Sequence, residues 1–279
     1  MHIESLIQLA LDAGLAIMDI YRLPEDHWQV EAKSDLSPLT LADRRSHEVI
    51  ARGLAATPYP VVSEEGGLHE AAARRSYDTV WIVDPLDGTK EFIRKNGEFT
   101  VNIALVSKGR PTLGVIYAPA LGLLYWGRTT DCPVEGEAGA FKAEVDPCTL
   151  QPGRPTPLPG RPTPLPATRA EAGGPLRVVA SRSHLSDETR AYIDSLERSF
   201  GSTVCLSKGS SLKICLVAEG EADVYPRLAP TMEWDTAAGQ AVATAAGCSV
   251  VRADDGRPVT YNKENLLNPY FIVKGPRLG

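Results

Sequence analysis

Apolar residues at the start of the chain recur at helical spacing. In the first twenty residues they fall at Ile3, Leu6, Ile7, Ala10, Ala13, Ile17 and Ile20. This period predicts an amphipathic helix. A second helix is predicted from about Thr40 to Ala56, because Thr40 can cap it and the Asp43 carboxylate in its first turn suits the helix dipole. Pro58 and Pro60 end this pattern.

Strand patterns follow in close succession. Four apolar runs are predicted as strands: Val80–Val83, Thr100–Val106, Thr112–Tyr117 and Leu123–Trp126. Short turns such as KGRP and APALG separate the last three, which predicts an antiparallel meander. After residue 175 strands and helices are mixed. Strands are predicted at 176–180, 204–206, 223–225 and 248–251, and helices after a Ser186 cap, at 211–219 and at 236–246. The chain is therefore predicted to have an α/β fold.

Residues 149–174 separate the two halves and contain GRPTPLP twice, at 153–159 and 160–166. Because proline has no backbone N–H, this density predicts a linker or surface insertion outside every helix and sheet. The chain is thus divided into an N-terminal α+β lobe (1–148), the proline-rich segment (149–174) and a C-terminal α/β lobe (175–279). A passive loop is the favoured interpretation, although the segment could also cover a pocket or dock a partner.

Composition excludes some classes of function. The 279 residues suffice for one large domain or two lobes. A net charge of −6 argues against a nucleic-acid polymer as ligand, but not against a small phosphorylated molecule. There is no run of eighteen apolar residues and no basic N-terminal leader, so neither a membrane span nor a signal peptide is predicted. Five scattered cysteines without a CxxC pair indicate reduced thiols in the cytoplasm.

The stretch WIVDPLDGT at 81–89 carries the strongest chemical signal. Asp84 and Asp87 can converge on one point across the predicted turn at Pro85, and Leu86 can offer its carbonyl there. Such oxygen ligands suit Mg²⁺ or Mn²⁺. The Gly88-Thr89 pair that follows lets the backbone approach a ligand and supplies a hydroxyl, and a helix beginning here would favour an anion. A phosphate ester beside a metal ion is the predicted ligand.

Two other acidic stretches, VVSEE and EWDTAAG, place Glu64, Glu65 and Asp235 beside a turn or a helix start. Surface turns favour acids, and an aspartate before Thr-Ala-Ala can be an ordinary helix cap. From the residues alone, both a structural role and a ligand role remain open for these three acids.

DPLDGT with EE upstream and WDTAAG downstream resembles the inositol monophosphatase superfamily of metal-dependent phosphatases. The further stretches DPLDGTKEF, NGEFTVNIALV, SRSH, GSSLK and YPR resemble its branch of bacterial 3′(2′),5′-bisphosphate nucleotidases of the CysQ type, whereas inositol monophosphatases tend to continue the motif as GTTNF. The resemblance covers the chain except the 149–174 segment. It implies a layered α/β/α/β/α sandwich with the active site between two lobes.

The resemblance also implies roles for individual residues. The implied metal ligands are Glu64, Asp84, the Leu86 carbonyl, Asp87 and Asp235, which would hold two or three Mg²⁺ ions, with Mn²⁺ as a possible substitute. Thr89 would orient the attacking water, backed by Asp43 or Glu64, with Glu65 as an alternative base. The displacement would be in line, without a covalent enzyme intermediate.

For the substrate, the resemblance assigns phosphate contacts to Gly88 and Thr89. The implied nucleotide-binding residues are His184, Ser210, Lys213 and Arg227, and the last two could hold the phosphate that is not cleaved. Lys208 is a further candidate cation. Without the resemblance, a structural explanation is favoured for three of them: Lys213 as a solvated helix residue, Arg227 as a surface charge at a strand end and His184 as a turn residue.

The implied activity is Mg²⁺-dependent hydrolysis of the 3′-phosphate of adenosine 3′,5′-bisphosphate to AMP and phosphate, a step that serves sulfate assimilation. 3′-Phosphoadenylyl sulfate is a possible second substrate. An inositol or sugar monophosphatase is the alternative, and a non-catalytic metal or nucleotide sensor a remote one, since the chain retains every acid and Thr89. We also expect inhibition by lithium. The expected location is the cytoplasm, which could include the inner membrane surface, and the expected oligomeric state is a monomer or a homodimer.

Overall fold

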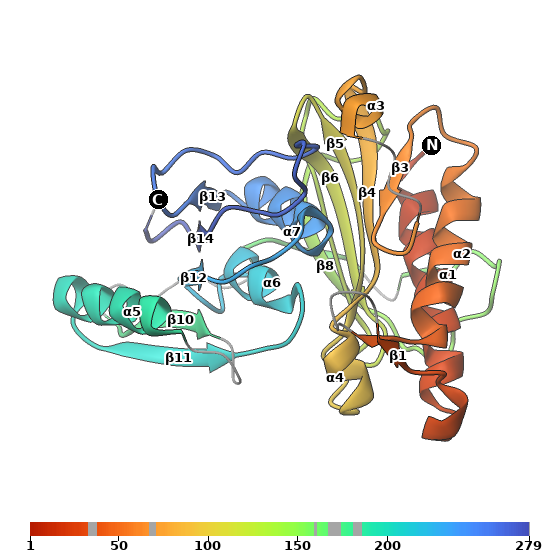
Figure 1. Cartoon of the computed structure of the whole chain (residues 1–279), viewed down its shortest axis with the longest axis horizontal. Coiled ribbons are helices and arrows are strands. Elements are labelled where there is room, and N and C mark those ends of the chain that lie inside the picture. The colour runs from red at the N-terminus through yellow and green to blue at the C-terminus, as the bar shows by residue number, and fades with distance from the viewer. Residues whose placement is uncertain (33–37, 67–70, 159–160, 167–173, 181–185, 279) are drawn as a thin grey trace.

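The computed structural model describes residues 1–32, 38–66, 71–158, 161–166, 174–180 and 186–278. Its layers follow one another in space as two helices, a seven-stranded sheet, two helices, a five-stranded sheet and one helix (Figure 1). Separate groups of buried apolar side chains fill the spaces between these layers. The predicted α/β/α/β/α sandwich is therefore confirmed.

The outer layer consists of α1 (Ile3–Tyr21) and α2 (Leu41–Leu54), which pack side by side on the seven-stranded sheet (Figure 1). Both helices were predicted. Thr40 caps α2 as expected: its Oγ1 accepts a hydrogen bond from Ala42 N at 3.2 Å, and Asp43 Oδ2 accepts one from Thr40 N at 2.8 Å. Between the two helices lie a short 3₁₀ turn at Glu25–His27 and a small antiparallel pair, β1 (Glu31–Ala32) and β2 (Pro38–Leu39).

The seven-stranded sheet has the order β3-β4-β5-β6-β7-β8-β9. Its strands are β3 (Val61–Ser63), β4 (Thr79–Asp87), β5 (Thr100–Ser107), β6 (Arg110–Ala118), β7 (Leu123–Arg128), β8 (Gly139–Glu144) and β9 (Thr163–Pro164). β3 is parallel to β4, and every later pair is antiparallel, so the predicted meander is confirmed. Two short helices, α3 (Ala71–Arg75) and α4 (Thr89–Ile93), precede and follow β4.

The prediction that β4 ends before the aspartates is wrong. The strand continues to Asp87, with Asp84 opposite Asn102 and Asp87 opposite Thr100. Three steps along β4 thus match two along β5, so one extra residue is accommodated in a bulge. Pro85 suits a bulge because it has no N–H to donate, and its carbonyl accepts a hydrogen bond from Ser46 Oγ at 2.7 Å. The bulge, not a turn, therefore positions the two acids.

The proline-rich segment also differs from its prediction, because part of it joins a sheet. Thr163 and Pro164 form the edge strand β9 and pair with β8, and Leu165 N donates to the Ala140 carbonyl at 2.8 Å. An edge strand tolerates proline, since one side of its backbone needs no partner. Earlier in the segment, Thr156 N donates to Gln8 Oε1 on α1 at 2.7 Å. These parts of the segment are therefore attached to the first sheet and its helices.

The five-stranded sheet has the order β11-β10-β12-β14-β13. Its strands are β10 (Leu176–Ala180), β11 (Thr203–Ser207), β12 (Val224–Arg227), β13 (Ser249–Arg252) and β14 (Phe271–Lys274). The first four match predicted strands, whereas β14 was not predicted, nor were β1, β2, β3, β8 and β9. On the far face lies α5 (Asp187–Phe200), which Ser186 caps as predicted by accepting a hydrogen bond from Thr189 N at 3.2 Å.

Between the sheets lie α6 (Leu212–Ala218) and α7 (Glu233–Ala245) (Figure 1). Helix α7 packs directly on the strands: a Cβ added at Gly114 of β6 would lie 2.3 Å from the Ala238 carbonyl oxygen. The helix begins three residues before the predicted Thr236, so Asp235 lies inside its first turn and is not the residue that precedes it. Among the helices of the described ranges, none has the length and apolar character needed to cross a membrane.

Candidate active site

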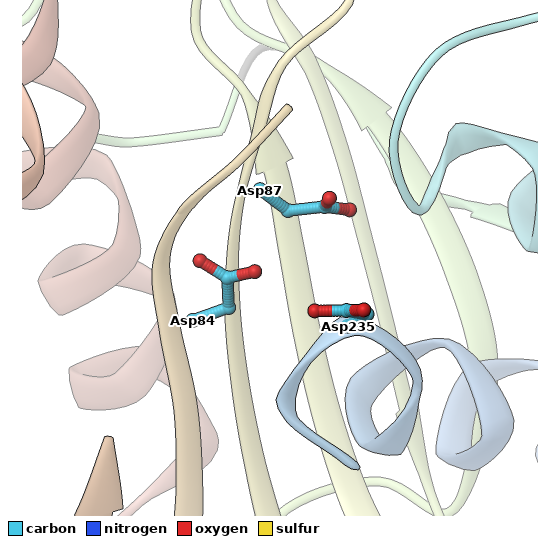
Figure 2. Close-up of side chains that lie close together, drawn as sticks. All are labelled: Asp84, Asp87 and Asp235. Atoms are coloured by element: carbon cyan, nitrogen blue, oxygen red, sulfur yellow. The ribbon is translucent and has the colours of Figure 1, made fainter. Parts of the chain in front are cut away.

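Three aspartates converge between the seven-stranded sheet and α7 (Figure 2). Asp84 and Asp87 come from the two sides of the β4 bulge, and Asp235 comes from the first turn of α7. Each offers a carboxylate oxygen, and these oxygens all lie within 4.8 Å of one another. We call these three residues the acid cluster. Segments about 150 residues apart in the sequence thus deliver carboxylates to one point.

Burial and mutual repulsion both act on the acid cluster. Asp84 is 1% exposed, and burial raises its pKa well above the usual range, with a further rise from the Glu64 and Asp87 charges. Burial likewise raises the pKa of Asp235 to about 8, and the Asp87 charge adds to the rise. Crowded buried carboxylates are costly unless a cation compensates them. An oxygen-only donor set of this kind fits a hard divalent cation.

Glu64 lies at the edge of the acid cluster. It follows β3, the parallel neighbour of β4, and its backbone N donates to the Val83 carbonyl at 3.2 Å. Its charge raises the pKa of both Asp84 and Asp235, so its carboxylate acts on the same point. The Leu86 carbonyl lies within the bulge, 3.5 Å from Thr89 Oγ1. The structure therefore brings all five predicted metal ligands into one region.

Thr89, the first residue of α4, has a buried carboxylate as its partner. Its Oγ1 donates to Asp43 Oδ1 at 3.2 Å. Asp43 is 2% exposed and is fixed from the other side, where its Oδ2 accepts hydrogen bonds from Thr40 N at 2.8 Å and from Thr40 Oγ1 at 2.5 Å. The helix cap of α2 thus holds the Asp43 carboxylate against Thr89. Glu65, the alternative base, lies half-buried in the turn after β3.

Gly88 and Ser210 meet at very short range. Gly88 has φ +90°, and a Cβ added there would lie 2.1 Å from Ser210 Oγ. The Ser210 hydroxyl lies 2.8 Å from the Asp87 carbonyl oxygen and 2.7 Å from the Glu98 carbonyl oxygen. It therefore has main-chain acceptors on β4 and in the loop before β5, which is a structural use of the side chain. Its predicted contact with the nucleotide stays a prediction.

A cavity of about 540 Å³ opens beside the acid cluster, with Asp87 and Asp235 in its wall. Lys213 of α6 and Arg227 of β12 line the same cavity, and we call them the cation pair. Burial lowers the pKa of Lys213. The two predicted phosphate-binding cations therefore share one cavity with the acids, while His184 lies outside the described residues.

Three residues to which the sequence analysis gave no role also line this cavity. They are Lys90, Glu91 and Arg94 of the α4 segment. Lys208, the weaker candidate, has its Nζ 3.5 Å from Glu98 Oε1 and so has an acidic partner. Lys90 directly follows DPLDGT and Arg94 comes four residues later. These two cations were the available signal, because they lie on the short helix α4 and directly after its last residue.

Two further residues that the sequence analysis missed contact the acid cluster. Ser211 Oγ lies 3.0 Å from Asp87 Oδ2, and Asn102 Nδ2 of β5 lies 3.4 Å from the same oxygen. The signal for Asn102 was a single amide within the apolar run VNIALV, and the signal for Ser211 was the second serine of GSSLK. Both side chains are fully buried polar groups beside a carboxylate.

Comparisons with known proteins identify the family. The sequence profile of the inositol monophosphatase family matches residues 2–271. The chain belongs to this family. It is 43% identical over 274 residues to the 3′(2′),5′-bisphosphate nucleotidase CysQ of Salmonella typhimurium, covering 97% of this chain and 98% of that protein.

Solved structures agree with this family membership. The crystal structure of CysQ from Bacteroides thetaiotaomicron is 48% identical, with a TM-score of 0.83, covering 97% of this chain and 96% of that one. An inositol monophosphatase of Thermotoga maritima shares the fold at 22% identity, with a TM-score of 0.66, covering 96% of this chain and 89% of that one. The resemblance to the CysQ group inferred from the sequence motifs is thereby confirmed.

Proposed function

We propose that this chain is a divalent-cation-dependent 3′(2′),5′-bisphosphate nucleotidase. It would hydrolyse the 3′-phosphate of adenosine 3′,5′-bisphosphate to give AMP and phosphate. The observation that carries the proposal is one cavity lined by Asp87 and Asp235 together with the cation pair. Relatives named CysQ that match nearly the whole chain support it.

The acid cluster, Glu64 and the Leu86 carbonyl would hold the cations. Their oxygen-only chemistry favours Mg²⁺, with Mn²⁺ as a substitute, and five ligands are enough for two or three ions that share carboxylates. Bound cations would supply positive charge that stabilises the transferring phosphoryl group and would make a water more acidic. Asp84 is buried and Asp235 is half-buried, and the pKa of both is raised; this feature of the chain calls for such compensation.

Thr89 and Asp43 would handle the proton of the attacking water. The hydrogen of Thr89 Oγ1 points to Asp43 Oδ1, which leaves the lone pairs of the hydroxyl oxygen free to accept a proton from water. Asp43 would then take up the threonine proton. We favour Asp43 over Glu65 as the base because of this hydrogen bond. Displacement in line on the phosphorus needs no covalent enzyme intermediate.

The cation pair would hold the phosphate that is not cleaved. Lysine and arginine make strong charge-assisted hydrogen bonds to phosphate oxygens. Gly88 and Thr89 remain the proposed contacts of the cleaved phosphate, and Ser210 and His184 remain proposed contacts of the nucleotide. 3′-Phosphoadenylyl sulfate is a second proposed substrate, because the anionic group on its 5′ side would contact the same cations.

Phosphate release by the purified protein tests this proposal. Adenosine 3′,5′-bisphosphate and inositol 1-phosphate would each be assayed with Mg²⁺, with and without a chelator. We expect turnover that the chelator abolishes and that strongly favours the nucleotide. A preference for inositol phosphate would be consistent with cation binding by the acid cluster but would refute nucleotide binding by the cation pair. Nucleotide binding without phosphate release would instead indicate a sensor.

Lithium is expected to inhibit the enzyme. Millimolar lithium would take a Mg²⁺ position with half the charge, and a lithium titration of the same assay measures this.

We also propose a location and an oligomeric state. All five cysteines are free thiols, which supports a reducing compartment such as the cytoplasm. The oligomeric state, monomer or homodimer, is measurable by light scattering.

A further inference from the structure

The Ser211 hydroxyl lies where three elements meet. The residue directly precedes α6 and is 3% exposed. Its Oγ is 2.9 Å from Asn102 Nδ2 of β5, 3.0 Å from Asp87 Oδ2 of β4 and 2.8 Å from the Asp235 carbonyl oxygen of α7. One buried hydroxyl thus contacts two residues of the acid cluster.

The chemistry of the partners fixes the direction of these hydrogen bonds. An amide nitrogen only donates, so Ser211 Oγ accepts from Asn102. A carboxylate and a carbonyl oxygen only accept, so the single hydroxyl proton is directed to Asp87 Oδ2 or to the Asp235 carbonyl. Asn102, itself 1% exposed, therefore orients the Ser211 hydroxyl toward the acids.

The same contacts restrain the Asp87 carboxylate. Its Oδ2 has Ser211 Oγ at 3.0 Å and Asn102 Nδ2 at 3.4 Å, so rotation of the carboxylate would break contacts within the protein. Figure 2 shows the Asp87 carboxylate near that of Asp235. With Oδ2 restrained, the remaining lone pairs keep a constant direction for a ligand.

We propose that Ser211 is a positioning residue that orients the Asp87 carboxylate for cation binding. The inference rests on the proposed function, because it assigns Asp87 to the cation site. Outer partners that orient metal-ligating carboxylates typically contribute about 10–100-fold to metal affinity. A role in packing alone would instead affect the stability of the fold and leave cation affinity unchanged.

The test measures Mn²⁺ binding to the metal-free full chain without substrate, by calorimetry or by the electron paramagnetic resonance signal of free Mn²⁺. Ser211→Ala should weaken Mn²⁺ binding about 10–100-fold. At saturating Mn²⁺ its KM for adenosine 3′,5′-bisphosphate should stay near that of the wild type, because the cation pair is untouched.

Ser46→Ala is the matched control. Ser46 is also a buried serine, and it donates to the same β4 bulge, but to the main-chain carbonyl of Pro85 at 2.7 Å. We expect it to lower stability and to change Mn²⁺ affinity far less than Ser211→Ala. Equal weakening in both variants, or wild-type affinity in Ser211→Ala, would overturn the inference. If the wild type itself bound no Mn²⁺, the proposed cation site would fail, and the inference with it.

Discussion

The acid cluster and the cation pair meet at one cavity, which Asp87 and Asp235 line together with both cations, but the two groups are built in different ways. Asp84 is buried, Asp87 and Asp235 are half-buried, and hydrogen bonds restrain them: Asp87 Oδ2 has Ser211 Oγ at 3.0 Å, and Asp84 Oδ1 accepts from Leu86 N at 3.0 Å. Each cation has a main-chain carbonyl nearby, with Lys213 Nζ 3.4 Å from the Lys208 oxygen and Arg227 Nη2 2.8 Å from the Pro230 oxygen. The acids and the cations thus differ in the kind of hydrogen-bond partner that holds them.

This difference indicates a division of labour. The acid cluster can act on any phosphate monoester, because its chemistry concerns only the phosphoryl group and its water. In the proposed function the cation pair would recognise a second anionic group, so it would distinguish substrates without taking part in bond cleavage. Changes in the acid cluster should therefore affect all substrates, and changes in the cation pair only those with two anionic groups.

Asp87→Asn should have the largest effect. The substitution keeps the shape of the side chain and removes one charge from the acid cluster, so cation binding and turnover should both fall. We expect a loss in kcat greater than the ~100-fold typical of losing an outer partner of a metal ligand. Phosphate release from both substrate classes, with circular dichroism to verify folding, measures this. Near-normal activity would refute the assignment of Asp87.

Asp43→Asn should come next, with a loss of about 10²–10⁴-fold in kcat, the usual contribution of a general base. Its amide can no longer take up the proton of Thr89, although it can still cap α2. Glu65→Gln is the matched control and should retain nearly full activity. If Glu65→Gln lost as much as Asp43→Asn, the roles of the two acids would have to be exchanged.

Gly88→Ala should have an intermediate effect, a loss in the free energy of unfolding. A methyl group there meets Ser210 Oγ at 2.1 Å and also has to adopt φ +90°. Gly247→Ala is the control, because Gly247 has φ +83° with no atom within 4 Å of an added Cβ. The left-handed conformation alone costs about 1–2 kcal/mol, so urea unfolding should show a larger loss for Gly88→Ala. Equal losses would mean that Ser210 moves away from the added methyl group at no cost in stability.

The smallest expected effect is on the pH dependence of kcat/KM, and it should appear with bisphosphate nucleotides but not with inositol phosphate. Burial lowers the pKa of Lys213, so its charge is lost at a lower pH than that of a free lysine. Because kcat/KM reports groups of the free enzyme, kcat/KM for adenosine 3′,5′-bisphosphate should decline as pH rises, starting below the usual lysine value of 10.5. Lys213→Arg should move this decline to higher pH. An unchanged alkaline profile in that variant would contradict the role of Lys213.

Local patterns predicted most of the fold, and contacts between distant segments account for what was missed. The 3.6-residue period identified α1 and α2, and alternating or apolar runs identified the meander. The β4 bulge has no such signal, because an apolar run followed by DPLD fits a turn as well as a bulge. β9 was missed because its pairing depends on a partner strand about twenty residues away and on the tolerance of an edge for proline.

The site shows the same limit. Asp84, Asp87 and Thr89 lie within six residues, so their convergence could be inferred from the motif and its resemblance. Ser211 acts on Asp87 from a position 124 residues away, and its neighbour Ser210 has the same residue type but main-chain partners. Only the three-dimensional arrangement distinguishes the two serines.

The central claim, that the acid cluster cleaves and the cation pair selects, is tested most directly with two nucleotides that differ by one phosphate. kcat/KM would be measured for adenosine 3′,5′-bisphosphate and for adenosine 3′-monophosphate, in the wild type and in Lys213→Ala and Arg227→Ala. Each lost charge-assisted contact is worth about 1.5–3 kcal/mol, so each variant should lose about 10–100-fold on the bisphosphate and little on the monophosphate. Equal losses on both nucleotides would contradict the division of labour.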